Sequence, residues 1–291
     1  MSRIAESELI VNPDGSIYHL HLRPEQLADD IIVVGDPQRV ALISKYFDSI
    51  EHKVTNREFV THTGRIGTKR ITALATGIGT DNIDIVLNEL DAVVNIDLQK
   101  REPKTEHHAL NIVRLGTSGA LQEDIPVDSF VFSQYGLGLD GLLNFYEQRD
   151  EVIDKELTEA FYSFSHWNKD LAKPYIVPGS VLLEERISEG MFKGITATAP
   201  GFYGPQGRVL RLPLMQKNIN ESLEQFRHNG NRVTNFEMET SALYGLGAML
   251  GHNTATVCAI IANRYTKTFS KDYKKTVEQL IKLLLERLLA D

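Results

Sequence analysis

Short apolar runs that alternate with amphipathic segments are the feature of this sequence that most limits its fold. The runs are rich in β-branched residues or nearly continuous in apolar ones, as expected for strands covered on both faces. They span residues 31–34, 71–75, 112–115, 130–132, 195–199 and 255–262. Strands that alternate with helices predict an α/β fold, a three-layer α/β/α sandwich around a mixed central β-sheet, with functional sites where strands end in loops.

The C-terminal segment carries the clearest helical pattern. Its apolar residues recur at steps of three and four, which predicts one long helix with a single apolar stripe. These residues are Val277, Leu280, Ile281, Leu284, Leu285 and Leu288.

Composition limits the domain organisation and the kind of partner. The chain has 291 residues, and no linker rich in Pro, Gly or Ser divides it, so we expect a single domain over residues 1–291. It carries no run of about 18 apolar residues, which predicts no membrane span. The start resembles no signal peptide and Cys258 is the only cysteine, so we expect a cytoplasmic protein with no internal disulfide, and Cys258 as a core residue without chemistry.

The net charge of -8 is unfavourable for non-specific binding of nucleic acid. A small anion such as phosphate would therefore need a local group of arginines. Individual arginines matter more here than the net charge.

Residues 97–108 form the most polar part of the sequence and are predicted to be a solvated, insertion-like loop. Two adjacent histidines, His107 and His108, lie at its end. No cysteine or third ligand with suitable spacing lies nearby, so we expect exposed side chains and not a metal site.

Residues 35–39, Gly-Asp-Pro-Gln-Arg, follow the first apolar run. A glycine at a strand end lets the backbone approach an anion, and Arg39 lies at the start of the next helix. Taken alone, the segment also fits an ordinary strand-to-helix turn with a surface arginine.

Residues 114–119, Arg-Leu-Gly-Thr-Ser-Gly, place an arginine inside an apolar strand that is expected to end in small and hydroxyl residues. A buried arginine needs an anionic partner. A structural carboxylate is one candidate. A bound phosphate is the other, because a guanidinium matches phosphate oxygens and Thr117 adds a hydroxyl donor.

Two further segments have the composition of a ligand site. Glu237, Met238 and Glu239 precede an Ala/Leu/Gly-rich helix. The two carboxylates complement the helix dipole, or they accept hydrogen bonds from the vicinal hydroxyls of a sugar. Residues 202–208 form a glycine-rich loop with an aromatic ring, an amide and a guanidinium. The loop is either simply solvated or binds a flat heterocycle by stacking and by hydrogen bonds to its polar edge.

In this order, the four segments resemble the uridine phosphorylase branch of the nucleoside phosphorylase family, and the likeness runs from about Tyr18 to the C-terminus. The resemblance implies a pentosyltransferase of pyrimidine nucleoside salvage that reversibly converts uridine and phosphate to uracil and ribose 1-phosphate. It implies no metal or organic cofactor, because phosphate is the co-substrate. It also implies a homodimer with shared active sites, or a hexamer built from such dimers.

The resemblance assigns roles to individual residues. Arg208, Gln206 and Arg114 would be catalytic. Phosphate would be bound by Gly35, Arg39, Arg114 and Thr117, together with Arg57 of a neighbouring subunit. Ribose would be bound by Glu237, Met238 and Glu239, together with a neighbouring His19. The base would be bound by Phe202, Gln206, Arg208 and Arg264.

Some family members hold a monovalent cation at residues that match Glu58, Ile78 and a serine. Asn82 stands at the serine position in this chain, which leaves the binding of a cation open.

Two rival activities also stay open. A purine nucleoside phosphorylase usually has an aspartate after the last apolar strand, a region where this chain has Asn263 and Arg264. A nucleosidase uses water and needs no group of phosphate-binding arginines.

Overall fold

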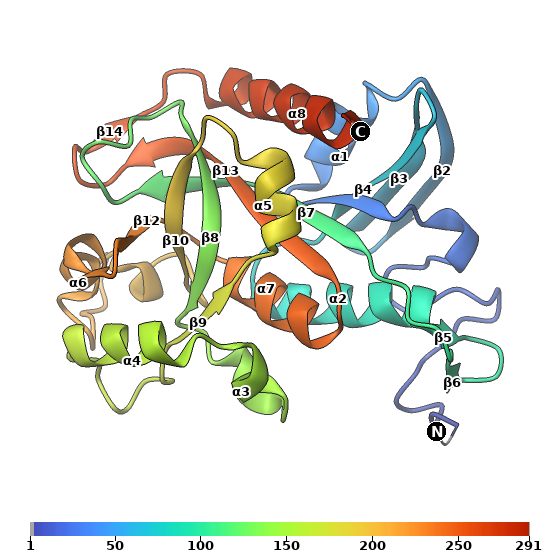
Figure 1. Cartoon of the computed structure of the whole chain (residues 1–291), viewed down its shortest axis with the longest axis horizontal. Coiled ribbons are helices and arrows are strands. Elements are labelled where there is room, and N and C mark those ends of the chain that lie inside the picture. Colours follow the sequence, from blue (N-terminus) through green and yellow to red (C-terminus); the bar gives the residue numbers. More distant parts are fainter. Residues whose placement is uncertain (1–2, 291) are drawn as a thin grey trace.

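The computed structural model describes residues 3–290. A mixed β-sheet of twelve strands forms its centre, and helices pack on both faces (Figure 1). The main path through the sheet runs β11, β12, β10, β8, β13, β7, β1, β4, β3, β2, while β14 pairs with β13 and β9 pairs with β8. The predicted α/β fold is confirmed.

The strands of this sheet are β1 (Asp30–Val34), β2 (Ser49–Asn56), β3 (Phe59–Ile66), β4 (Lys69–Ala75), β7 (Asn111–Ala120), β8 (Phe130–Gly138), β9 (Tyr175–Pro178), β10 (Phe192–Thr198), β11 (Arg227–His228), β12 (Asn231–Glu237), β13 (Asn253–Asn263) and β14 (Thr268–Phe269). The α-helices are α1 (Pro37–Ser44), α2 (Thr80–Asn95), α3 (Arg149–Val152), α4 (Lys155–Phe164), α5 (Val181–Ile187), α6 (Ile219–Gln225), α7 (Thr240–Met249) and α8 (Tyr273–Leu289). Short 3-10 helices are η1 (Pro24–Gln26), η2 (Leu142–Phe145) and η3 (Gly204–Gln206).

Strand β1 shows why the predicted strands are apolar on both sides. Ile31 and Val33 pack into a core with α2 and α7, whereas Ile32 and Val34 pack into a second core with α1 and α8. Each of these side chains is fully buried, which is worth roughly 1.5–3 kcal/mol per side chain. The α8 stripe lies in the second core, so the predicted C-terminal helix is confirmed.

Strand β7 is longer than predicted. Residues 116–119 were expected to follow the strand, but they lie inside it because β13 pairs with β7 from Asn111 to Ala120. On its other edge, β1 pairs with β7 only as far as Arg114. Beyond Arg114, the edge of β7 that faces β1 is therefore no longer paired with β1.

Part of the sheet closes on itself. Strand β12 pairs with β10 in parallel and also with the end of β7, where Asn235 lies opposite Ala120 and Phe236 opposite Gly119. Residues distant in sequence are thereby brought together. The start of α7 lies beside the open edge of β7.

The polar segment 97–108 is mostly exposed, as predicted, but it is not a simple loop. Strands β5 (Ile96–Asp97) and β6 (Glu102–Pro103) form a small hairpin, and the N–H of Ile4 donates to the carbonyl of Arg101 at 2.8 Å. These contacts tie the N-terminal segment to the hairpin.

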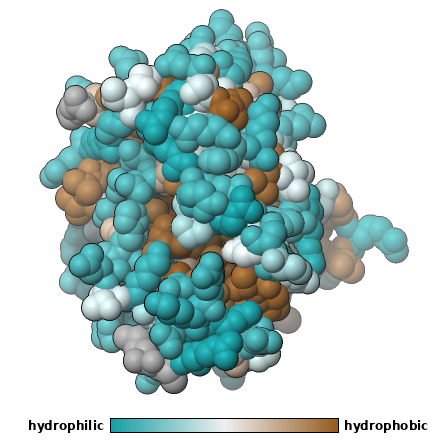
Figure 2. Space-filling model, turned by 90° about the vertical axis from the view of Figure 1, so that its right-hand side faces the viewer, coloured by the Kyte–Doolittle hydropathy of each residue, from teal (hydrophilic) through white to brown (hydrophobic). Residues whose placement is uncertain are grey.

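Within residues 3–290, no helix has both the length and the hydrophobicity that a membrane span requires. On the face that corresponds to the right-hand side of Figure 1, hydrophobic side chains reach the surface in groups between hydrophilic ones (Figure 2). Ile10 and Ile50 are among the exposed hydrophobic residues of the chain.

Candidate active site

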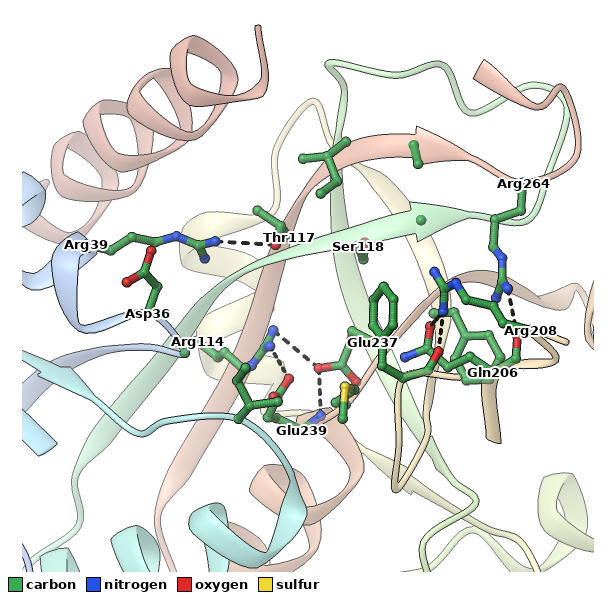
Figure 3. Close-up of a pocket in the computed structure, with 18 of the residues that line it drawn as sticks. Asp36, Arg39, Arg114, Thr117, Ser118, Gln206, Arg208, Glu237, Glu239 and Arg264 are labelled. Atoms are coloured by element: carbon green, nitrogen blue, oxygen red, sulfur yellow. Dashed lines mark hydrogen bonds and ion pairs between the residues drawn. The ribbon is translucent and has the colours of Figure 1, made fainter. Parts of the chain in front are cut away.

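A cavity of about 460 Å³ lies where β1 ends and β7 continues (Figure 3). It brings together eleven of the residues predicted to bind phosphate, ribose or base, although they come from five separate segments of the chain. These residues are Gly35, Arg39, Arg114, Thr117, Phe202, Gln206, Arg208, Glu237, Met238, Glu239 and Arg264. The structure thus places the four motifs at one site.

One end of the cavity carries Arg39 and Thr117. Helix α1 begins at Pro37, and Asp36 caps it by accepting the N–H of Gln38 at 2.9 Å. Arg39 projects from the first turn, and its Nη2 donates to Thr117 Oγ1 at 3.4 Å. Burial and the nearby charge of Arg114 lower the pKa of Arg39. Among residues 3–290, Arg39 forms no ion pair with a carboxylate, so this end of the cavity favours an anion.

Arg114 lies at the centre of the site and is only 5% exposed. The sequence left its partner open between a carboxylate and phosphate. The structure gives it carboxylates, because Nη1 lies 3.2 Å from Glu237 Oε2 and Nη2 pairs with Glu239. Burial opposes the charge of Arg114, but these two glutamates outweigh that effect and raise its pKa.

The carboxylates of Glu237 and Glu239 are fixed by backbone amides. Glu237 accepts the N–H groups of Glu239 at 2.9 Å and Thr240 at 3.1 Å, so it caps the first turn of α7. Glu239 accepts the N–H of Gly79 at 2.9 Å, before α2. Gly79 has a φ of 100°, which favours glycine at this close approach. Burial raises the pKa of Glu239, while Arg114 opposes this shift. The amide contacts of Glu237 fit the helix-capping interpretation of this residue. Met238 also lines the cavity.

The other end of the cavity carries the predicted base residues. Arg208 stacks on Phe202, with the guanidinium carbon 3.9 Å from the ring centroid, and its Nη1 donates to Gln206 Oε1 at 2.6 Å. Arg264 Nη2 donates to the carbonyl of Gln206 at 2.7 Å. Burial, with a smaller contribution from Arg208, lowers the pKa of Arg264 to about 10. This end combines an aromatic face with two cations.

Sequence reasoning missed several residues that line the cavity. Ser118 and Phe236 lie inside the motifs already described, and they could have been found once the strand register was known. Ile261 and Phe269 come from β13 and the two-residue strand β14. Phe269 carries no local signal of a site, because only the pairing of β14 with β13 brings it there.

His19 and Arg57 do not line the cavity of their own chain. His19 Nδ1 lies 2.6 Å from Glu89 Oε1, and Arg57 Nη2 donates to the hydroxyl of Tyr18 at 3.3 Å. Arg57 lies in the turn between β2 and β3 with a φ of 52°, a left-handed conformation that is uncommon for arginine. The two residues lie close together on one surface.

The residues proposed for a monovalent cation do not fit one well. The side-chain amide of Asn82 donates to the carbonyl of Ile78 at 3.3 Å. A cation bound to that carbonyl would face the Asn82 N–H, which repels positive charge.

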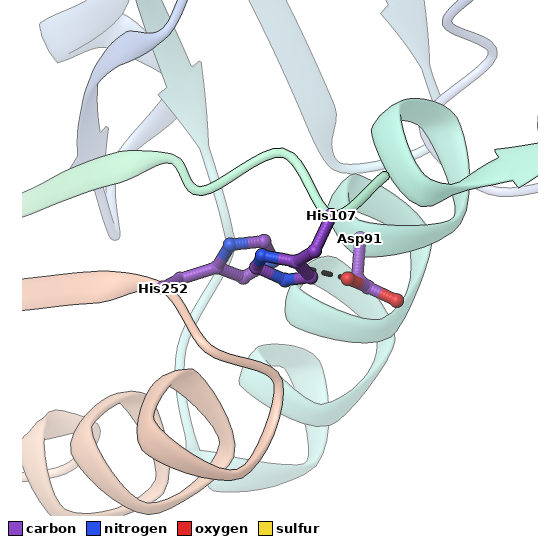
Figure 4. A group of neighbouring side chains, drawn as sticks. All are labelled: Asp91, His107 and His252. Carbon is purple, nitrogen blue, oxygen red and sulfur yellow. Dashed lines mark ion pairs between the residues drawn. The ribbon is translucent and has the colours of Figure 1, made fainter. Parts of the chain in front are cut away.

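The histidines of the polar segment have partners that sequence spacing did not reveal. His107 lies close to His252 and Asp91, with one ligand atom of each within 4.8 Å of the others (Figure 4). However, His252 Nδ1 accepts the N–H of Leu110 at 3.2 Å, so its proton is on Nε2, which lies 3.3 Å from Asp91 Oδ1. A metal would need a lone pair at Nε2, which makes this group a poor metal site.

With this geometry in place, comparison with known proteins identifies the family. Residues 29–290 match the phosphorylase superfamily. The chain belongs to this superfamily.

Similar proteins cover nearly all of the chain. A uridine phosphorylase of Thermococcus kodakarensis is 28% identical, covering 98% of this chain and 93% of the relative. A DeoD-type purine nucleoside phosphorylase of Streptococcus suis is 27% identical, covering 94% and 99%.

A crystal structure of a Trypanosoma brucei nucleoside phosphorylase, described as showing uridine phosphorylase activity, aligns with a TM-score of 0.87 at 30% identity. It covers 98% of this chain and 100% of that structure. The superfamily thus includes relatives named for both kinds of base.

Proposed function

We propose that this phosphorylase is a uridine phosphorylase, which reversibly converts uridine and phosphate to uracil and ribose 1-phosphate. One cavity supports the proposal: Arg39, which pairs with no carboxylate of residues 3–290, lies at one end, and Phe202, Gln206 and Arg208 lie at the other. The names of relatives from Thermococcus kodakarensis and Escherichia coli agree with it.

Phosphate is proposed to bind between Gly35, Arg39, Arg114 and Thr117. The ribose lies beside Glu237, Met238 and Glu239, which places C1' between the phosphate and the base. Holding uridine and phosphate in one cavity makes their reaction effectively unimolecular, which lowers the entropic part of the barrier. Arg114 connects the phosphate-binding and ribose-binding regions, because it pairs with Glu237 and Glu239 and its charge acts on Arg39.

The base end supplies the electrostatic part of catalysis. As the C1'–N1 bond breaks, its electron pair leaves with the uracil, and a phosphate oxygen forms the new bond to C1'. The uracil anion then takes up the proton that the hydrogen phosphate loses. Negative charge grows on the uracil carbonyls and is met by Arg208 and Gln206, with Arg264 behind them. Donors that are already oriented toward developing charge stabilise the transition state more than the ground state.

The purine alternative lacks its acid. In the region where purine enzymes use an aspartate this chain has Asn263 and Arg264, neither of which is an acid, and the Asn263 amide is committed to the fold. Its Nδ2 donates to the carbonyls of Gln122 and Ile125 at 2.8 Å each, and its Oδ1 accepts the N–H of Thr266. Asn263 is 2% exposed and does not line the cavity. It therefore has no free group to offer a purine N7.

The active site is proposed to be shared between two chains of a homodimer. His19 and Arg57 lie outside the cavity of their own chain but close to each other, so one partner surface would deliver both to a neighbouring site. His19 would reach the ribose 5'-hydroxyl and Arg57 the phosphate. Measurement of the mass in solution distinguishes a single dimer from a hexamer of such dimers.

A panel of nucleosides tests the choice of base. The purified protein is supplied with saturating phosphate and with uridine, cytidine, inosine or adenosine, and free base is quantified by chromatography. We expect kcat/KM for uridine to exceed that for inosine at least tenfold. Faster cleavage of inosine than of uridine would overturn the proposal.

A further inference from the structure

One hydrogen-bond donor to Glu237 comes from the adjacent parallel strand β10. The hydroxyl of Thr198 donates to Glu237 Oε1 at 2.7 Å. Its other donors are the amides of Glu239 and Thr240, which follow it in the chain, and Arg114. Thr198 lies opposite Glu237 in the parallel register of β10 and β12.

The direction of the Thr198 hydrogen bond is determined by its second partner. The backbone N–H of Ser241 lies 3.0 Å from Thr198 Oγ1 and can only donate. The Thr198 oxygen therefore accepts from Ser241, and its one hydrogen is left for the Glu237 carboxylate. Ser241 is itself held in place, because its hydroxyl donates to Asp140 at 2.9 Å.

We propose that Thr198 is a positioning residue that orients the Glu237 carboxylate toward Arg114. Thr198 is fully buried and does not line the cavity, so it cannot touch a substrate. Glu237 does line the cavity. Thr198 thus acts through Glu237, and the inference rests on the proposed function only where it predicts an effect on uridine cleavage.

Thr198→Val keeps the shape of the side chain and removes both hydrogen bonds of the hydroxyl, so the Glu237 carboxylate loses one donor and the N–H of Ser241 loses its acceptor. Loss of a hydrogen bond to a charged group costs roughly 1.5–3 kcal/mol, which corresponds to a change of about tenfold or more in an equilibrium or rate constant. Thr198→Ser keeps the hydroxyl. Thr63→Val is the matched control, because Thr63 is equally buried on β3, away from the cavity, and its hydroxyl donates to the carbonyl of Gln26 at 2.7 Å.

The test measures kcat and KM for uridine at saturating phosphate, together with the melting temperature, for the wild type and the three variants. We expect Thr198→Val to lower kcat/KM about tenfold or more and Thr198→Ser to stay within about threefold of the wild type. Thr63→Val should lower the melting temperature and keep wild-type kinetics. Equal kinetics in the two valine variants, or a serine variant as impaired as the valine variant, would overturn the inference.

A second readout does not depend on the proposed function. In a crystal structure of Thr198→Val we expect the Glu237 carboxylate to rotate away from Arg114. An unchanged Glu237 conformation in that variant would overturn the positioning role whatever the substrate is. If the wild type fails to cleave uridine, the proposed function fails, and this structure still decides the role of Thr198.

Discussion

Arg208→Ala is expected to lower the turnover of uridine about a hundredfold. Removing one donor aimed at developing negative charge costs about 10²–10³ in rate, or roughly 2.7–4 kcal/mol. The smaller value applies here because Arg264 and Gln206 remain beside the base. Removal of Arg208 deprives Gln206 of the 2.6 Å hydrogen bond to its Oε1. The contact between Arg264 and the Gln206 carbonyl does not involve Arg208.

Folding should change little, because Arg208 is only partly buried and its stacking on Phe202 is worth about 0.5–1 kcal/mol. The assay compares kcat and KM for Arg208→Ala, for the wild type and for the control Arg211→Ala, an exposed arginine three residues further along that lies outside the active-site cavity. The deficit should shrink with 5-fluorouridine, since fluorine stabilises the departing anion. Unchanged kcat for uridine in Arg208→Ala would refute the assignment.

Three further predictions concern other parts of the site. Arg39→Ala should raise the KM for phosphate at least tenfold with a smaller change for uridine, measured by varying each substrate; equal changes would contradict a phosphate role. The double mutant His19→Ala/Arg57→Ala and the double mutant Gln206→Ala/Arg208→Ala should each lose activity. Mixing the two should restore part of it, because a mixed dimer contains one site with all four residues intact; no recovery despite subunit exchange would contradict shared sites. Burial raises the pKa of Asp140, so the folded state keeps this proton to a higher pH than the unfolded state, and stability falls as pH rises from the unfolded pKa of 3.8 through the raised folded pKa. Asp140→Asn should flatten the fall of the melting temperature as pH rises above 3.8, and an unchanged slope would contradict it.

Local sequence was enough to predict the buried strands and the long C-terminal helix. Residues 31–34 are covered on both faces, and such burial leaves a continuous apolar run. The hairpin of β2 and β3 was not predicted, because β2 is largely exposed and shows little apolar pattern. Strand β7 was predicted too short, because its second half contains glycine and hydroxyl residues that belong to a strand only through pairing with β13.

The candidate site residues were predicted mainly from family resemblance, and their partners were beyond the reach of local patterns. The carboxylates that pair with Arg114 lie more than a hundred residues further along the chain, and the β12–β7 pairing brings them close. His107 lies close to Asp91 of α2 and to His252, which directly precedes β13, a contact that the tertiary fold creates. Contacts of this kind depend on topology, so the sequence could only leave carboxylate and phosphate open as alternatives for Arg114.

Phosphate dependence is the most direct test of the central claim. Uracil release from uridine should be measured across phosphate concentrations, with ribose 1-phosphate quantified in the same samples. We predict negligible release without phosphate, saturation as phosphate rises, and one ribose 1-phosphate for each uracil. Uracil released at an undiminished rate in phosphate-free buffer, with free ribose as the other product, would contradict the account.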